Sequence, residues 1–579
     1  MARPNPYALR LLLGTALALV LLAILVLAAV PPVDRDALTH HLAVPKLYLA
    51  HGGIYEIPAV PFSYYPMNLD LLYMAALHLG SDILPKYLHC AFGLLTAGML
   101  FTYLRKRLRS TAYGLLGCLL FLSLPVIVKL SITVYVDLGL IFFSTAALLQ
   151  LFRWAESGFQ VRHLLLSGVL TGLCLGTKYN GMLCAFLLGL VVLILPLRAS
   201  AGVGGSEDLP ASTHKKKSSV WALGQAVLFC AAALTVFSPW MIRNYAWTGN
   251  PVYPMADGLW SSNTQRASDN PRVAAEAEND RSSTENEGAG LNHFALRTVV
   301  FGESLLDILL IPVRIFFQGA DDNPHYFDGR LNPYLLIFPI AALALTGRRR
   351  RPAAWVIEQR LMVGFAAIYL LLSFLLTDMR VRYVAPILPP LVLLTVFGIH
   401  DLKTVFQNSN AGLTRRWGSA GIHAAVAGLL AMNGLYILDL MGRVEPFGYL
   451  TGKVSRDAYI QKHRPEYAAN MFINRNLDGD SRILCLFTGN RIYYSDREMV
   501  CDSELFRRII RIAPSAEAAR ERLFQLGISH LLLHGPIFTR WADSQFDDRA
   551  RGVLQNLFKQ DIDGIFQSHD YYLFQLVKG

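Results

Sequence analysis

Long apolar segments recur along most of this chain, and they constrain its fold more than any other feature. The first of them, residues 11–30, contains no charged residue. A run of about 18 or more apolar residues is long enough for a helix to cross the hydrocarbon core of a bilayer. The composition agrees, because 53% of the chain is hydrophobic and only 16% is charged, whereas soluble proteins carry about 25% charged residues. The sequence therefore predicts a membrane protein with many spans and excludes a soluble globular one.

We expect about eleven spanning helices, which sets the fold class as mainly α. The first apolar run is too long for a signal peptide, and Pro31-Pro32 replaces the small-residue cleavage pattern, so we interpret it as an uncleaved span. The shorter segment 66–80 carries Asp70 and His78 and is predicted to lie at the membrane surface. The expected spans are residues 9–30, 83–104, 112–130, 137–153, 163–179, 181–198, 220–240, 332–347, 357–376, 383–400 and 419–440.

Basic clusters in five loops predict the orientation of these spans. If the span count is right, all five clusters lie on one side of the membrane together with the N-terminus, and basic loops face the cytoplasm. We therefore assign the net charge of +11 to membrane orientation rather than to nucleic-acid binding. The clusters are Arg105, Lys106, Arg107 and Arg109; Arg153 and Arg162; Arg198 with Lys215, Lys216 and Lys217; Arg348, Arg349, Arg350 and Arg351; and Lys403, Arg415 and Arg416.

The remaining polar segments are then predicted to lie outside. They are residues 31–82, a short turn at 129–136, a long loop at 241–331 whose polar middle (261–290) is typical of a mobile segment, and everything after 441. Strand-like runs at 482–488, 528–534 and 571–576 and a helical pattern at 515–526 predict a small soluble α/β domain. We thus expect a transmembrane domain at 1–440 and an outer domain at 441–579, where Cys485 and Cys501 could form a disulfide.

Three acids lie where spans leave the membrane. Asp34 and Asp36 follow the first span, and Asp137 lies at the mouth of the fourth. A carboxylate at this depth is partly dehydrated and can serve as a general base. The plainer interpretation is helix capping, because Asp favours helix N-termini. Both alternatives stay open for all three acids.

Four basic residues occupy the outer face, where the charge rule disfavours them. They are Lys178, Arg243, Arg380 and Arg382. Such groups suit an anionic ligand such as a phosphate. The alternative is an ion pair with a nearby acid, for instance Arg380 with Asp378, although we do not expect all four to be simple pairs.

The sequence holds only weak metal signals. His40 and His41 are adjacent, so on an α-helix they point in different directions, whereas a two-His metal site requires i, i+4 spacing. Asp34-Arg35-Asp36 has the form of a DxD motif, but a match of two residues is common by chance. We therefore assign no metal-ligating residues, while a divalent cation stays open as a cofactor.

Taken in order, these motifs resemble the GT-C superfamily of membrane glycosyltransferases, in the bacterial branch related to protein mannosyltransferases and lipid A aminoarabinose transferases. The resemblance runs over about residues 8–400, and the tail around Leu526-Gly527-Ile528 is similar to outer domains of such bacterial proteins. The residues that carry it are Asp36 with Ala37–His41, Tyr65-Pro66, Thr177-Lys178-Tyr179, Trp240 to Tyr245, Gly249-Asn250-Pro251 and Arg382-Tyr383.

The resemblance implies an inverting transfer of a sugar from a polyprenyl-phosphate carrier to an acceptor hydroxyl at the outer face of a bacterial inner membrane. The base would be Asp36, with Asp34 as the other candidate and Asp137 as the second outer-loop acid. The acceptor would be a lipid, a polysaccharide or a protein, and nucleic acid is not expected. Lys178, Arg243, Arg380 and Arg382 would bind the donor phosphate, and His40, His41, Tyr65 and Tyr179 would line the cavity or contact the acceptor.

Two other functions compete with this interpretation. A secondary transporter often shows two similar halves and charges near the membrane midplane, and we find neither in this sequence. A non-catalytic envelope scaffold would bind partners through its tail. The clustering of charges at one mouth of the bundle favours chemistry over both.

Overall fold

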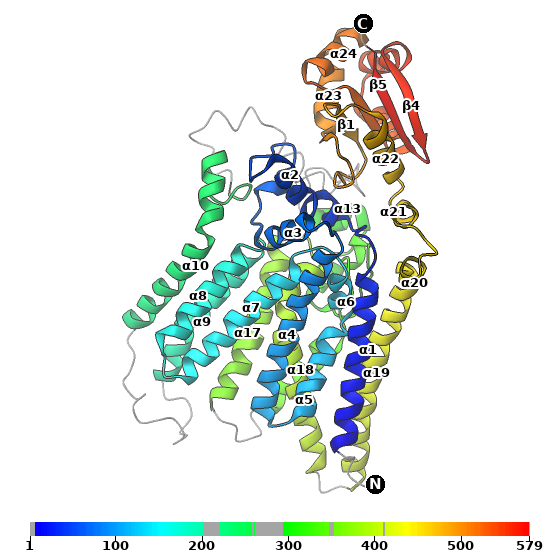
Figure 1. The fold of residues 1–579 in the computed structure, drawn as a ribbon. Helices are drawn as coiled ribbons and strands as arrows, with labels where there is room; N and C mark the ends of the chain where they lie inside the picture. The colour runs from blue at the N-terminus through cyan, green and yellow to red at the C-terminus, as the bar shows by residue number, and fades with distance from the viewer. Residues whose placement is uncertain are drawn as a thin grey trace.

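The computed structural model describes residues 6–200, 219–256, 260, 293–346, 353–408 and 412–577. Long helices form a tilted bundle, and a small domain with a sheet lies beyond one end of it (Figure 1). The expected mobile stretch 261–290 lies outside the described residues, as do the basic clusters at 215–217 and 348–351. The two chain ends lie at opposite ends of the molecule (Figure 1).

Each of the eleven expected apolar segments is helical. Seven helices in the described ranges are long and apolar enough to cross a membrane, or eight if one bent pair counts as a span. Three shorter apolar helices coincide with the remaining expected segments, so a count of eleven spans stays a prediction. The long helices are α1 (Pro6–Ala28), α4 (Leu84–Leu108), α7 (Asp137–Glu156), α10 (Ser219–Thr248), α17 (Ala353–Leu376), α18 (Leu388–Gln407, preceded by η6, Val381–Ile387) and α19 (Gly412–Val444); the shorter ones are α8 (Val161–Leu175), α9 (Gly181–Ser200) and α16 (Tyr334–Thr346).

The bent pair is α5 (Thr111–Leu122) and α6 (Pro125–Ser131), whose axes differ by 69°. Leu124 precedes Pro125 and is extended, with ψ of 130°. Proline disfavours helical backbone at the residue before it, so the helix breaks there. As a result α6 turns toward the outer loops and presents Lys129 to a cavity described below.

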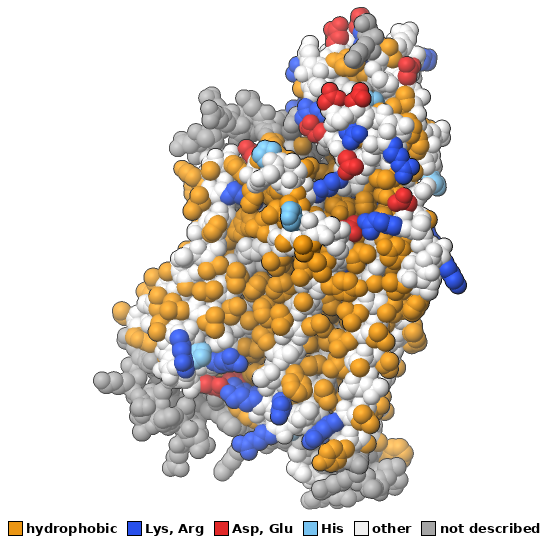
Figure 2. Space-filling view, viewed as in Figure 1, with side chains coloured by type: hydrophobic (Ala, Val, Ile, Leu, Met, Phe, Trp, Pro, Cys, Tyr) orange, Lys and Arg blue, Asp and Glu red, His pale blue; other side chains and the backbone are white. Residues whose placement is uncertain are grey.

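Apolar side chains cover the middle of the bundle surface (Figure 2). On α1, Leu11 is 73% exposed and Leu19 is 62% exposed. A water-soluble monomer rarely exposes a continuous apolar surface of this size. Lys and Arg gather at the end opposite the sheet domain (Figure 2), where Lys106 and Glu156 lie 3.1 Å apart and join the ends of α4 and α7.

Short elements cover the end of the bundle that faces the sheet domain. The expected surface helix at 66–80 is α3 (Asn68–His78). The others are η1 (Ala37–His41), α2 (Ala43–His51), η2 (Pro61–Tyr64), α13 (His293–Phe301), α14 (Leu305–Leu309), α15 (Ile311–Arg314) and η5 (Pro324–Tyr326).

The C-terminal region follows α20 (Pro446–Leu450), α21 (Arg456–His463) and α22 (Tyr467–Asn476), and it is the α/β domain expected from the sequence. Its sheet has the order β2-β1-β3-β5-β4, in which β2, β1 and β3 are parallel and β5 is antiparallel to both neighbours. The strands are β1 (Arg482–Leu486), β2 (Glu498–Cys501), β3 (His530–His534), β4 (Ile562–Ser568) and β5 (Tyr571–Leu576), with helices α23 (Ser503–Ile512), α24 (Ala516–Gln525), α25 (Gly535–Gln545), α26 (Asp548–Asn556) and η7 (Leu557–Asp561).

The disulfide that the sequence allows is not formed. Cys485 and Cys501 lie opposite each other on the parallel strands β1 and β2, and both are free and buried. The pair therefore contributes to the sheet core as two small apolar side chains.

Candidate active site

The first outer loop begins where α1 ends, because Pro31-Pro32 cannot continue the helix. Beyond the end of α1 at Ala28, Lys86 Nζ donates to the Val30 carbonyl over 2.9 Å. Tyr494 Oη donates to the Pro32 carbonyl over 2.7 Å, and Arg464 Nε donates to the Val33 carbonyl. Side chains from α4 and from the C-terminal region thus hold the backbone just before Asp34 and Asp36.

Asp36 forms an ion pair with Arg382, which lies in η6 at the start of α18. Burial alone would raise the pKa of Asp36, but the Arg382 guanidinium, together with His40 and His41, brings this pKa well below its ordinary value. The carboxylate is therefore ionised throughout the physiological range. A carboxylate that stays bound to a guanidinium is a weak base, so base catalysis requires Arg382 to find another partner.

Asp137 and Lys178 form a second pair, with 2.8 Å between Oδ1 and Nζ. Asp137 is the first residue of α7, and Lys178 lies in the turn between α8 and α9. The Tyr383 ring lies 5.3 Å from Lys178 Nζ and 5.3 Å from the Arg382 guanidinium carbon. Two cations thus lie near one aromatic ring, whose quadrupole favours both.

Arg243 contacts the backbone of the first outer loop and two tryptophan rings. Its Nη2 donates to the carbonyls of Tyr64 and Tyr65 over 2.6 and 3.1 Å. Its guanidinium also lies 4.6 Å from the Trp240 ring and 4.9 Å from the Trp247 ring. Since Arg243 lines neither cavity described below, these contacts make it a support for the link between η2 and α3.

Two cavities meet at the Asp36–Arg382 pair, and both residues line each of them. The larger has a volume of about 450 Å³ and the smaller about 280 Å³. The pair therefore lies at the boundary between two chambers, each of a size that holds a small molecule or part of a larger one.

The larger cavity is lined by acids and bases in nearly equal number. Arg380 is paired with Asp378 over 3.1 Å, which is the pairing that the sequence offered as the alternative. Lys129 is paired with Asp322 over 3.0 Å. The six carboxylates are Asp34, Asp36, Asp321, Asp322, Asp328 and Asp378, and the five cations are Arg35, Lys129, Arg380, Arg382 and Arg464.

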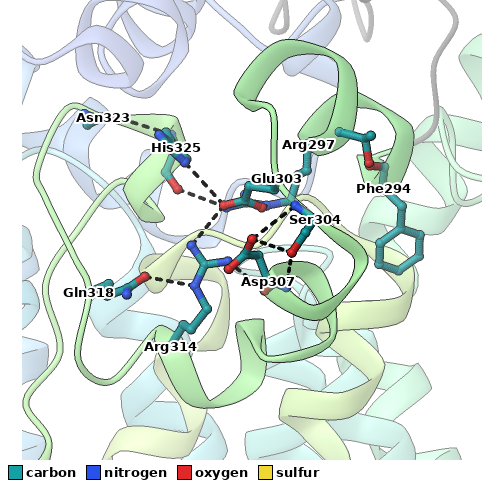
Figure 3. A network of polar contacts seen from close by, with 10 residues as sticks. Phe294, Arg297, Glu303, Ser304, Asp307, Arg314, Gln318, Asn323 and His325 are labelled. Atoms are coloured by element: carbon teal, nitrogen blue, oxygen red, sulfur yellow. Dashed lines mark hydrogen bonds and ion pairs between the residues drawn. The ribbon is translucent and has the colours of Figure 1, made fainter.

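One wall of the larger cavity comes from the segment that contains α13 and η5, and a buried carboxylate holds this segment together (Figure 3). Glu303 bonds with Arg297 over 2.6 Å, with Arg314 over 3.0 Å and with His325 over 3.3 Å. Burial opposes the ionisation of Glu303, but its bonds to Arg297 and Arg314 lower its pKa. No motif in the sequence marked this network, because its members are ordinary residues spread over a long loop.

The smaller cavity gathers most of the residues that the sequence singled out. Asp36, His40, His41, Tyr65, Lys178, Tyr179 and Arg382 all line it. His41 Nδ1 lies 2.7 Å from Asp70 Oδ1, and the His40 ring stacks on Phe62 with 4.5 Å between centroids. The sequence showed Asp70 only as an acid within an apolar helix. An acid in such a helix is unusual, and this was the signal that could have placed Asp70 at the smaller cavity.

Comparison with known proteins adds to this geometry. A family model described as dolichyl-phosphate-mannose-protein mannosyltransferase matches residues 62–241. ArnT from Cupriavidus metallidurans in the apo state is similar in structure, with a TM-score of 0.54 at 12% identity over 97% of each chain. The same protein bound to undecaprenyl phosphate gives a TM-score of 0.53 at 13% identity, again over 97% of each chain. No curated protein matches the sequence. The two structural likenesses extend over nearly the whole chain and show a shared fold.

Proposed function

We propose that this membrane protein, which has the fold of the GT-C glycosyltransferases, transfers a sugar from a polyprenyl-phosphate carrier to an acceptor hydroxyl at the outer face of the membrane. The observation that carries the proposal is the Asp36–Arg382 pair at the boundary of two cavities. A candidate base and a candidate phosphate-binding cation there touch both chambers, which is the arrangement that a two-substrate transfer needs.

We assign the donor phosphate to the smaller cavity. The larger one has six carboxylates against five cations, so it disfavours a phosphate. The smaller one has Lys178 and Arg382 as its cations and Asp36 and Asp70 as its acids. Guanidinium binds phosphate in a bidentate manner and lysine binds it as a point charge. The acceptor then reaches Asp36 through the larger cavity.

The chemistry follows from this placement. When the donor binds, its phosphate replaces Asp36 as the ion-pair partner of Arg382. The pKa of Asp36 then rises toward its ordinary value. Asp36 removes the proton of the acceptor hydroxyl, and that oxygen forms a bond to the anomeric carbon. The bond between this carbon and the phosphate oxygen breaks on the opposite face, so the configuration inverts and polyprenyl phosphate leaves. Lys178 and Arg382 stabilise the charge that develops on the departing phosphate.

We assign the side of the membrane from the described charges. Arg105, Lys106, Arg153 and Arg162 belong to the predicted inward loops, and basic side chains gather at the end of the bundle opposite the C-terminal domain (Figure 2). By the positive-inside rule this end faces the cytoplasm. The site and the C-terminal domain then lie outside a bacterial inner membrane, where a polyprenyl-linked sugar is presented to envelope acceptors.

A transfer assay tests the proposal. The protein is reconstituted in vesicles with radiolabelled polyprenyl-phosphate sugars and an envelope extract as acceptor. Asp36→Asn is expected to lower transfer by about 10²–10⁴-fold, the usual contribution of a general base. Asp548→Asn, which changes a fully exposed acid of the C-terminal domain, is the matched control. Equal transfer by Asp36→Asn and wild type would exclude Asp36 as the base, and solute flux without any transfer would favour a transporter.

A further inference from the structure

The segment between α13 and η5 carries an apolar surface that the described residues leave uncovered. It consists of α14, α15 and the turns that follow each of them, and we call it the 305–317 segment. Six large apolar side chains recur along it at spacings of one, three and four residues, which places them on one face of a helix. They are Leu305, Leu306, Leu309, Leu310, Val313 and Phe317, and their exposed fractions range from 44% to 74%.

The opposite face of the 305–317 segment is also apolar, and it is buried. Three isoleucines on that face are at most 5% exposed, namely Ile308, Ile311 and Ile315. α15 packs against α17, and the Phe294 ring of α13 lies 5.2 Å from the Phe374 ring in the last turn of α17. Since α17 is long and apolar enough to cross a membrane, the 305–317 segment lies beside the end of a spanning helix.

The uncovered face adjoins the apolar surface of that helix. Over its last two turns α17 exposes Leu371, Leu375 and Leu376, with exposed fractions of 50%, 47% and 63%. A protein surface in water rarely carries an apolar patch of this extent unless the patch binds something. The six side chains are pure hydrocarbon and offer no hydrogen bond, whereas protein–protein interfaces combine apolar contacts with hydrogen bonds. These properties favour lipid as the partner.

The backbone of the segment is arranged as lipid requires. A backbone N–H in hydrocarbon must find its acceptor within the protein. Residue 312 is a proline and has no N–H, and a capping box between Ser304 and Asp307 supplies acceptors at the first turn. The N–H groups that donate to a carbonyl between residues 304 and 314 are those of Ile308, Leu310, Val313, Arg314, Ile315, Phe316, Phe317 and Gln318.

The two charged residues of the segment are each provided with partners. Arg314 is directed toward Glu303, 3.0 Å away, and donates to the Asp307 carbonyl over 2.6 Å (Figure 3). The Asp307 carboxylate accepts hydrogen bonds from the N–H and hydroxyl of Ser304 over 3.1 and 2.6 Å. The buried Glu303 network thus neutralises the cation on the protein side of the segment, away from the uncovered face.

We propose that the uncovered face of the 305–317 segment binds acyl chains of the leaflet nearer the C-terminal domain. The segment then lies in the membrane interface instead of in water, as helices with one broad apolar face do. α13 and η5, which bound the larger cavity, are held by the Glu303 network on one side and by the bilayer on the other. The inference is independent of sugar transfer, because contact with lipid is measured without donor or acceptor.

Quenching by labelled lipid tests the proposal. In the full chain with Cys230→Ala, bimane is attached to Leu305→Cys, Leu309→Cys or Val313→Cys, and the protein is placed in phospholipid nanodiscs. Phospholipid with a nitroxide on its acyl chain is expected to lower the fluorescence at all three positions about twofold or more, because the quencher and the face share one layer. Leu371→Cys, on the exposed surface of α17, is the positive control.

The matched control is Ile512→Cys on α23 of the C-terminal domain. Ile512 is 76% exposed and Leu305 is 74% exposed, so the two differ mainly in their surroundings. Bimane at 512 is expected to be quenched by iodide in the water and not by the labelled lipid. The same result at 305, 309 and 313 would overturn the proposal. Protection of these positions from both quenchers would overturn it as well, because a protein partner or a second copy would then cover the face.

A charge substitution provides a readout without a fluorophore. Leu309→Asp places a carboxylate on the proposed lipid face, and Ile512→Asp makes the corresponding change in water. In nanodiscs, Leu309→Asp is expected to speed amide hydrogen exchange at residues 304–318 about tenfold or more, because the segment must leave the acyl chains to hydrate the charge. Ile512→Asp is expected to leave exchange at its own helix, α23, unchanged. Unchanged exchange at 304–318 in Leu309→Asp would contradict immersion in lipid.

Discussion

Arg382 donates a hydrogen bond to Asp36 although 346 residues separate the two in the chain. The pair joins the first outer loop to the start of α18 and lowers the pKa of the carboxylate that we propose as the base. Without donor, the base is thus held ionised but weakly basic. Arg382, the cation that lowers the basicity of Asp36, is also a suitable partner for an incoming phosphate. Donor binding and activation of the base are therefore coupled.

This coupling predicts a shift in the pH dependence of transfer. The pKa of Asp36 is lowered mainly by Arg382, and the active carboxylate exists above that pKa. In Arg382→Gln the pKa rises, so the acid limb of kcat/KM measured in wild type is expected to move to higher pH. The KM for the donor is also expected to rise about tenfold or more, because one charge-assisted contact is lost. An acid limb that does not move would show that Arg382 does not control the base.

The Asp137–Lys178 pair predicts a large loss of stability when one partner is removed. Asp137 is 1% exposed, and its replacement by Asn leaves Lys178 without its carboxylate. Breaking a buried pair in this way costs about 3–5 kcal/mol. We expect Asp137→Asn to lower the thermal midpoint in detergent, and Asp137→Asn with Lys178→Met to recover most of it while transfer stays low. Full transfer activity of the double variant would show that Lys178 does not bind the donor phosphate.

Glu303 predicts a stability difference that depends on pH. Its pKa is lowered in the folded protein, so its pairs add stability above the unfolded pKa of about 4.3 and lose it as the pH falls through the folded pKa. Glu303→Gln is expected to lower the thermal midpoint strongly at pH 7 and by less at pH 3.5, which lies below the unfolded pKa. Glu517→Gln, which changes an exposed acid that lies 3.8 Å from Arg520, should change little at either pH. An equal effect of Glu303→Gln at both pH values would contradict this account.

The contacts of the C-terminal region predict that it positions the first outer loop. Arg464 and Tyr494 bind the carbonyls of Val33 and Pro32, and Tyr493 N donates to the Leu38 carbonyl over 3.1 Å. Arg464→Ala is expected to speed amide hydrogen exchange at residues 33–42 and to lower kcat more than it changes donor KM. Lys462→Ala, in an exposed pair, serves as control. Unchanged exchange in that segment would argue against a positioning role.

The proposed orientation of the chain in the membrane predicts which residues a reagent outside the cell can label. Cys230 is the exposed cysteine, so the background variant replaces it by Ala. In this background, a membrane-impermeant maleimide should label Asp548→Cys from outside the intact cell. Lys106→Cys, at the opposite end of the bundle, should be labelled only after permeabilisation. The reverse pattern would place the site in the cytoplasm.

Much of this architecture could be predicted from local sequence. The apolar segments became helices, the expected segment at 66–80 contains the short helix α3, the α/β tail was confirmed, and the chain shares its fold with ArnT, in agreement with the GT-C resemblance. Strands β2 and β4 were missed: β2 is only four residues long, and in β4 apolar and polar positions do not alternate regularly. The break at Pro125 was inside an apolar run that looked continuous, and only a proline marked it.

The sequence by itself determined that the chain enters a membrane and where its charges gather, because hydrophobicity acts residue by residue along each segment. It did not determine which charges meet. Arg243 and Arg382 look alike in sequence, yet one contacts backbone carbonyls and tryptophans and the other a carboxylate. Only the packing of helices decides such distances, and over a few ångströms the energy between charges depends on distance and burial rather than on order in the chain. The π-helical turn η1, which brings His40 and His41 beside Asp36, was likewise decided by tertiary structure.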